Sequence, residues 1–152
     1  MTRWEKYSFT ALTALVAATG GVYFWMKYLM ATDDPFAVTN HPLQGLMLQL
    51  HVLAAPAFLV VFGMILNSHI WQKIGKPIPN RRSGLLSLVA TIVMVASGYL
   101  LQVLTGERAW RAAFVAHIGS SVVFTAAYVT HLAISAWMWA RERRAAGDAA
   151  AA

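Results

Sequence analysis

The sequence of 152 residues contains no cysteine and few charged residues. The absence of thiols excludes disulfides, cysteine-ligated iron–sulfur clusters and covalently attached c-type haem, which requires a C-x-x-C-H motif. Charged residues make up only 12% of the chain, whereas a typical soluble domain has about 25%. Hydrophobic residues make up 59%, and this composition is typical of a membrane protein.

Four apolar stretches are long enough to cross a bilayer. A hydrocarbon core of about 30 Å needs roughly 20 residues of helix, and the stretches cover about residues 7–29, 42–70, 85–104 and 110–140. Pro42 suits the first turn of the second helix. We predict an all-α fold, an integral membrane four-helix bundle over residues 1–144, followed by a disordered tail at residues 145–152.

Basic residues give the direction of the predicted helices. They cluster at both ends of the chain and in the middle connection, at Arg3, Lys6, Lys73, Lys76, Arg81, Arg82, Arg141, Arg143 and Arg144. Membrane proteins keep such clusters on the cytoplasmic side, so we expect both termini to be cytoplasmic. The net charge of +6 is explained in the same way, and we expect no nucleic-acid partner.

The start of the chain also has features of a signal peptide, because Arg3 and Lys6 precede an apolar run. That run ends in the bulky residues 23–26 rather than in the small residues of a cleavage site. We therefore expect this segment to be retained as the first helix.

Four of the five histidines lie inside the apolar stretches, in two helix-spaced pairs. His51 and His69 are eighteen residues apart, and His117 and His131 are fourteen apart. At about 100° per residue, eighteen steps return to the starting direction and fourteen miss it by about 40°. Each helix would therefore turn both imidazoles toward the same neighbour. Histidine inside a membrane usually faces a cofactor, a cavity or a partner.

The second and fourth helices are expected to cross the membrane in the same direction, so their histidines match in depth. His51 matches His117 near the outer side, and His69 matches His131 near the inner side. We expect each pair to fill both axial positions of one haem iron, giving two non-covalently bound b-type haems. The inner histidines match less well in depth. The two histidines are about 27 Å apart along the second helix but about 21 Å apart along the fourth.

For any single histidine, a hydrogen bond to a neighbouring helix is the simpler explanation. His41 precedes Pro42 in an outer connection, and we expect it to be a solvated loop residue rather than a ligand. Pro56 lies between His51 and His69, where it would supply a kink if the helix needs one.

The histidine pattern resembles the four-helix, two-haem b-type cytochrome subunits of respiratory complexes, such as the membrane subunits of formate dehydrogenase and nickel–iron hydrogenase. The resemblance covers about residues 8–140. It depends on His51, His69 and the run from His117-Ile118-Gly119-Ser120-Ser121 to His131, and it departs from the family in the longer spacing of the first pair. It implies an electron-transfer subunit of the bacterial cytoplasmic membrane that exchanges electrons between quinone and a partner protein.

Small and basic residues near the histidines are candidates for holding the rest of each haem. Small side chains allow a close approach, and anionic propionates favour cationic partners. The small residues are Gly119 and Ser120, with Gly63, Gly98 and Ala55 as further candidates, and the basic residues are Arg81 and Arg82 for the inner haem and Arg108 and Arg111 for the outer one. The alternative role of the small residues is ordinary helix packing, and that of the basic residues is to set the orientation of the helices in the membrane.

The chain has no glycine-rich nucleotide fingerprint, so we expect no complete active site. It would depend on a partner that carries c-type haem, iron–sulfur or molybdenum chemistry, with membrane lipid around it and quinone as an exchangeable substrate. Polar residues near the span ends are candidates for hydrogen bonds to quinone: Gln44, Gln49, Gln102, Asn67 and Ser68.

Two other functions fit the same residues. A small transporter or proton channel would use the histidines as a relay, although the acidic residues all lie outside the predicted spans. A membrane anchor with a single haem would need only His51 and His117. An absorption spectrum and the ratio of haem to protein separate the three.

Overall fold

The computed structural model describes residues 2–31, 37–77 and 80–151, with the side chains of residues 149–151 left out. Every regular element within these ranges is helical. The chain divides into two compact units, Met1–Lys73 and Ile74–Ala152, and each unit is described by itself. Asp33, Asp34, Ile78 and Pro79, which lie in the predicted connections, are outside the described residues.

The first unit begins with α1, Arg3–Phe24, which continues as the π-helix η1, Trp25–Leu29. A capping box fixes its start: the Glu5 N–H donates to Thr2 Oγ1 at 3.2 Å, and the Thr2 N–H donates to Glu5 Oε2 at 2.6 Å. This box satisfies backbone donors that a helix start leaves without partners. Glu5, which the sequence placed outside the spans, is a buried residue of the first turn.

The second helix of this unit is α2, Gln44–Ile65, which continues as the π-helix η2, Leu66–Ile70, and the short α3, Trp71–Lys73. Pro42 lies in a turn before α2 rather than in its first helical turn. Pro56 lies inside α2 and does not end it.

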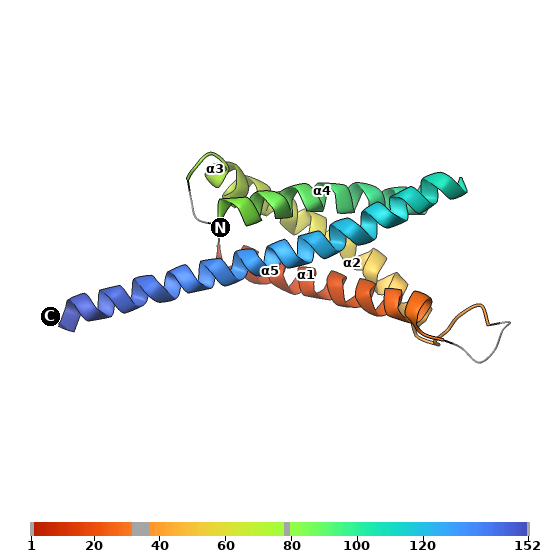
Figure 1. Ribbon diagram of the computed structural model, residues 1–152, viewed down its shortest axis with the longest axis horizontal. Helices are drawn as coiled ribbons and strands as arrows, with labels where there is room; N and C mark the ends of the chain where they lie inside the picture. Colours follow the sequence, from red (N-terminus) through yellow and green to blue (C-terminus); the bar gives the residue numbers. More distant parts are fainter. Residues whose placement is uncertain (1, 32–36, 78–79, 152) are drawn as a thin grey trace. The chain divides into compact units, whose positions relative to one another are not determined.

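α1 and α2 lie side by side and antiparallel (Figure 1). Three phenylalanines join them: the rings of Phe9 and Phe58 lie 5.2 Å apart, and Phe62 stacks on both at 6.1–6.2 Å. Such offset stacking adds to the packing between apolar surfaces. Phe58 is only 3% exposed, so this cluster is part of the core of the unit.

The second unit consists of α4, Arg81–Val103, and α5, Glu107–Ala151, which also lie side by side and antiparallel (Figure 1). Their contact uses small buried residues, including Ala90 and Thr91 of α4 and Ala113 and Ala127 of α5. Small side chains let helix backbones approach closely, as in many membrane proteins.

α5 extends well past the start of α4 (Figure 1). Its 45 residues correspond to about 67 Å of helix. The structure continues this helix to Ala151, where the sequence predicts a disordered tail from residue 145. The tail is mostly alanine, the residue with the highest helix propensity, and this composition extends α5.

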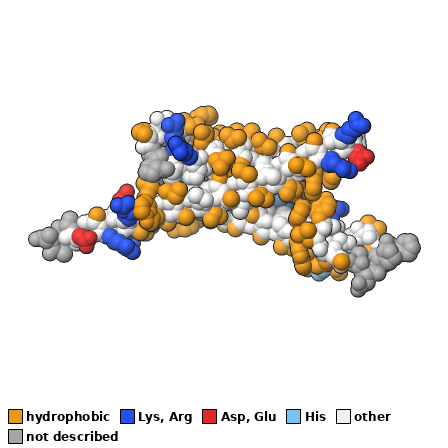
Figure 2. Space-filling model, viewed as in Figure 1, with side chains coloured by type: hydrophobic (Ala, Val, Ile, Leu, Met, Phe, Trp, Pro, Cys, Tyr) orange, Lys and Arg blue, Asp and Glu red, His pale blue; other side chains and the backbone are white. Residues whose placement is uncertain are grey.

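Four helical stretches are long and apolar enough to cross a membrane: Arg3–Leu29, Gln44–Lys73, Arg81–Val103 and Glu107–Asp148. Only 17–22% of the residues in these windows are buried inside the protein, so most of their apolar surface requires another apolar environment. On the face shown in Figure 2, charged side chains gather near helix ends. The six tryptophans are 37–60% exposed. The composition and helix lengths make this a multi-pass membrane protein.

Candidate functional site

His51, in α2, directs its imidazole at α1. Its Nδ1–H donates a hydrogen bond to the carbonyl oxygen of Val16 at 2.9 Å. Gly20 lies one turn further along α1, and a Cβ atom there would be 2.7 Å from His51 Cε1 and 2.8 Å from Nδ1. The ring therefore reaches the α1 backbone because Gly20 has no side chain.

His117, in α5, has the same relation to α4. Its Nδ1–H donates to the carbonyl oxygen of Met94 at 2.9 Å, and Ser97 Oγ lies 3.5 Å from the same nitrogen. A Cβ atom on Gly98 would be 3.0 Å from His117 Cε1 and 3.2 Å from Nδ1. In both units the acceptor carbonyl and the glycine are four residues apart.

A hydroxyl residue precedes the glycine in each case. In α1 the three positions are Val16, Thr19 and Gly20, and in α4 they are Met94, Ser97 and Gly98. The hydroxyl donates back to the acceptor carbonyl, at 3.3 Å from Thr19 Oγ1 and 3.1 Å from Ser97 Oγ. A carbonyl oxygen has two lone pairs, and the missing Cβ of the glycine leaves room for the imidazole. We call Thr19-Gly20 and Ser97-Gly98 hydroxyl–glycine pairs.

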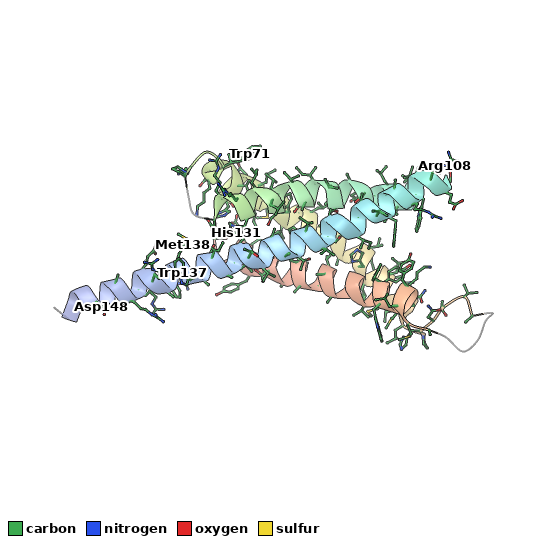
Figure 3. All side chains as sticks on the ribbon, in the orientation of Figure 1. Trp71, Arg108, His131, Trp137, Met138 and Asp148 are labelled. Atoms are coloured by element: carbon green, nitrogen blue, oxygen red, sulfur yellow. The ribbon has the colours of Figure 1, made fainter. Side chains whose placement is uncertain are left out.

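A third hydroxyl–glycine pair, Ser83-Gly84, faces His131, which is labelled on α5 in Figure 3. Here Nδ1 lies 3.3 Å from Ser83 Oγ, which in turn donates to the Asn80 carbonyl oxygen at 2.9 Å. A Cβ atom on Gly84 would be 3.2 Å from His131 Cε1. Gly84 and Gly98 are fourteen residues apart, as are His117 and His131, so two antiparallel helices present two matching sites.

The carbonyl contacts determine which ring nitrogen of His51 and of His117 carries the proton. Because a carbonyl oxygen only accepts, Nδ1 of His51 and of His117 carries the proton. With its own proton directed to the Asn80 carbonyl, the Ser83 oxygen is able to accept a hydrogen bond from Nδ1 of His131. In a neutral imidazole protonated on Nδ1, the lone pair is on Nε2, and a hydrogen bond from the other ring nitrogen is the usual support of a metal-ligating histidine.

His41 shows the opposite arrangement. The backbone N–H of Leu43 donates to His41 Nδ1 at 3.1 Å, so this nitrogen carries the lone pair. The bond belongs to the turn before α2, and His41 has the structural role of a connecting residue.

His69 has a different setting from the other three. It lies in η2, where the π-helical backbone winds more loosely than an α-helix, so a constant angle per residue does not hold between His51 and His69. The only glycines of α1 are Gly20 and Gly21, and both lie far along that helix from its start. The expectation that His69 faces the same neighbour as His51 stays a prediction.

The four candidate arginines are exposed at the helix ends. Arg81 and Arg82 are the first two residues of α4, within one turn of Gly84 and thus at the same end of the unit as His131. Arg108 lies in the first turn of α5, at the opposite end from Trp137 (Figure 3).

The start of α5 has an open hollow of about 790 Å³ on one face. Arg108 and Arg111 line it together with the small residues Ala112 and Ala116. Arg111 also donates to Glu107 Oε1 at 2.9 Å, an exposed ion pair that contributes little to stability. Cationic side chains thus adjoin an apolar surface that ends one residue before His117.

The predicted small residues divide into two groups. Gly98 lies beside a histidine ring, whereas a Cβ atom on Gly119 or Gly63 would meet nothing within 4 Å. Ser120 Oγ donates within its own helix, to the carbonyl oxygens of Ala116 at 2.6 Å and His117 at 3.2 Å. A role of Gly119 and Ser120 in binding a cofactor stays a prediction.

The polar residues near the span ends have varied surroundings. Gln44 is buried, and its Oε1 accepts the Asn40 N–H at 3.2 Å. Gln102 Nε2 donates to the Gly98 carbonyl at 3.4 Å. Gln49 and Asn67 are exposed, and Ser68 is half-buried. None of these contacts distinguishes one of them as a quinone ligand.

Sequence reasoning missed five residues that contact the rings or their acceptors: Thr19, Gly20, Ser83, Gly84 and Ser97. A signal was present, since a Ser or Thr directly before a glycine occurs three times in the helices facing the histidines. The equal spacing of fourteen in Gly84–Gly98 and His117–His131 would have paired them.

In the part of the chain that the structure describes, no three His, Cys, Asp or Glu side chains gather as a metal site. A haem iron needs only two axial protein ligands, so this finding concerns other kinds of metal centre. Comparison with family models, with curated proteins and with solved structures finds no match for the chain.

Proposed function

We propose that this protein is a membrane electron-transfer subunit that holds two b-type haems, one between His51 and His117 and one between His69 and His131. The observation that carries the proposal is the common setting of His51 and His117. Each donates from Nδ1 to a helix carbonyl at 2.9 Å, beside a glycine. The two histidines belong to different units, so each unit would supply one ligand.

The donor set suits iron, because neutral imidazole nitrogens are good ligands for it. Haem b with two histidine ligands supplies reversible one-electron transfer without an open position for oxygen. The carbonyls of Val16 and Met94 would hold the rings in place and raise the basicity of Nε2. Gly20 and Gly98 would keep each ring close to the neighbouring helix.

The arginines support a binding site for the anionic edge of each haem. Arg108 and Arg111 precede His117 on α5 and line the open hollow, and Arg81 and Arg82 lie beside the Ser83-Gly84 pair at the His131 end. Propionate carboxylates would form charge-assisted hydrogen bonds with such side chains.

The surroundings of the subunit follow from what the sequence contains. Basic residues at the termini and in the middle connection support a cytoplasmic location for both ends, in a bacterial inner membrane. Electrons would pass between quinone and a partner subunit that carries c-type haem, iron–sulfur or molybdenum chemistry, since the chain has no cysteine and no nucleotide fingerprint.

A second candidate is a membrane anchor with one haem, held by His51 and His117 alone. The setting of His69 favours it, because this residue lies in a π-helical segment. The ratio of haem to protein distinguishes one site from two.

The test begins with the absorption spectrum of the purified protein, which should show b-type bands that sharpen on reduction. His51→Ala and His117→Ala should each remove the same haem, so that the ratio of haem to protein falls from about two to about one. His41→Ala is the control and should keep both. A colourless preparation, or full occupancy in both variants, would contradict the proposal.

A further inference from the structure

His131 differs from His51 and His117 in the group that lies within hydrogen-bond distance of Nδ1. The other two rings donate directly to a backbone carbonyl at 2.9 Å. His131 lies 3.3 Å from Ser83 Oγ and reaches the Asn80 carbonyl only through that hydroxyl, which donates onward at 2.9 Å. The bond at His131 is therefore longer and is made to a group that also donates.

Two further hydrogen bonds close this chain of contacts into a cycle. Asn80 Nδ2 donates to Ser135 Oγ at 2.8 Å, and Ser135 Oγ donates to the backbone carbonyl of His131 at 2.8 Å. Asparagine at a helix start usually caps its own helix, but here no side-chain cap bond forms at Asn80. Its side chain instead crosses to α5 and fixes the position of α5 relative to Ser83.

We infer that Ser83 is a positioning residue that holds the His131 imidazole in its Nδ1-protonated form and makes this ligand site electronically different from that of His51 and His117. The second part of the inference rests on the proposed function. A hydrogen bond from Nδ1 raises the basicity of a ligating imidazole and stabilises the oxidised metal.

A longer bond to a hydroxyl transfers less electron density than a short bond to a carbonyl. The haem held by His131 should therefore have a higher midpoint potential than the haem held by His51 and His117. Removing the hydroxyl should raise that higher potential further and leave the lower one unchanged.

The experiment compares Ser83→Ala with Ser83→Thr and Ser87→Ala. Ser87 is the matched control, since it is a half-buried serine one turn further along α4 whose hydroxyl donates within the helix, to the Ser83 carbonyl at 2.9 Å. The first readout is ¹⁵N NMR of labelled histidines in the full chain without haem. The second is a redox titration of the chain with haem bound.

In the NMR readout, wild type, Ser87→Ala and Ser83→Thr should keep His131 protonated on Nδ1, and Ser83→Ala should lose that preference. In the titration, only Ser83→Ala should shift the higher potential upward. An unchanged His131 tautomer in Ser83→Ala, or an equal change in Ser87→Ala, overturns the inference. If the protein binds no haem, the proposed function fails and the NMR result still decides the role of Ser83.

Discussion

Gly20 leaves the space that the imidazole of His51 occupies, since a Cβ atom at this position would lie 2.7 Å from the ring. The next residue, Gly21, has nothing within 4 Å of the corresponding position. Two adjacent glycines of α1 therefore differ in their contact with a candidate ligand, Gly20 being half-buried against the ring and Gly21 exposed. They provide a matched pair of substitutions.

Gly20→Ala should push the His51 ring away from Val16 and weaken haem binding at that site by about tenfold or more, as loss of an outer-shell contact does at metal sites. Gly21→Ala should bind haem as the wild type does. Both substitutions bring the same gain in helix propensity, about 1 kcal/mol, so the difference between them reports the contact. Haem titration of the two purified variants measures it, and equal affinities would refute the geometry.

The hydrogen bond between Asn80 and Ser135 should contribute to the stability of the α4–α5 pair. Bonds between helices within membranes contribute about 0.6 kcal/mol on average and at most about 1.7. A double-mutant cycle with Asn80→Ala and Ser135→Ala, followed by reversible unfolding in detergent, should give a coupling free energy in that range. Strictly additive effects would show that this bond does not contribute.

Phe58→Ala should destabilise the first unit strongly, because the side chain is 3% exposed and stacks on Phe9 and Phe62. Removing a buried phenylalanine costs about 3–5 kcal/mol in well-packed cores. Leu53→Ala is the control, since Leu53 lies on the same helix and is 74% exposed, and it should cost less than about 0.5 kcal/mol. Losses of unfolding free energy of similar size in the two variants would mean that the phenylalanine cluster does not contribute to the core.

A reporter that fluoresces only in the cytoplasm should give full signal when fused after Ala152. The reason is the cluster Arg141, Arg143 and Arg144 at the end of the last span. Two of these arginines lie over tryptophan rings, Arg141 at 4.7 Å from Trp137 and Arg143 at 4.6 Å from Trp139. Signal from a periplasm-specific reporter at the same position would reverse the proposed orientation.

The positions of the helices could be predicted from the sequence, because a run of about 20 apolar residues has few alternatives to a spanning helix. Each of the four predicted stretches overlaps one observed helical stretch; the second begins two residues before Gln44 and the third ends one residue after Val103. The ends of the helices were harder to predict. The sequence did not reveal that Glu5 is buried in the first turn. It also did not reveal that α5 continues through an alanine-rich tail whose composition suggests disorder.

The candidate site was predicted only in part. Histidines are conspicuous in an apolar helix, but Thr19, Ser83 and Ser97 look like ordinary hydroxyls bonded within their own helix, and they do make such bonds. Their second role depends on which residue of the neighbouring helix lies opposite, and antiparallel register is not visible in one helix alone. The π-turn around His69 likewise has no composition signature.

Each unit contains hydrogen bonds that orient its own histidine rings: the bond of His51 to Val16 lies within the first unit, and the bonds of His117 to Met94 and of His131 to Ser83 lie within the second. During synthesis, all residues that orient the His51 imidazole within the first unit are therefore translated before α4. The two halves would not need each other to arrange these side chains. Expressed as separate polypeptides divided between Lys73 and Arg81, they should still present those histidines in the same tautomers.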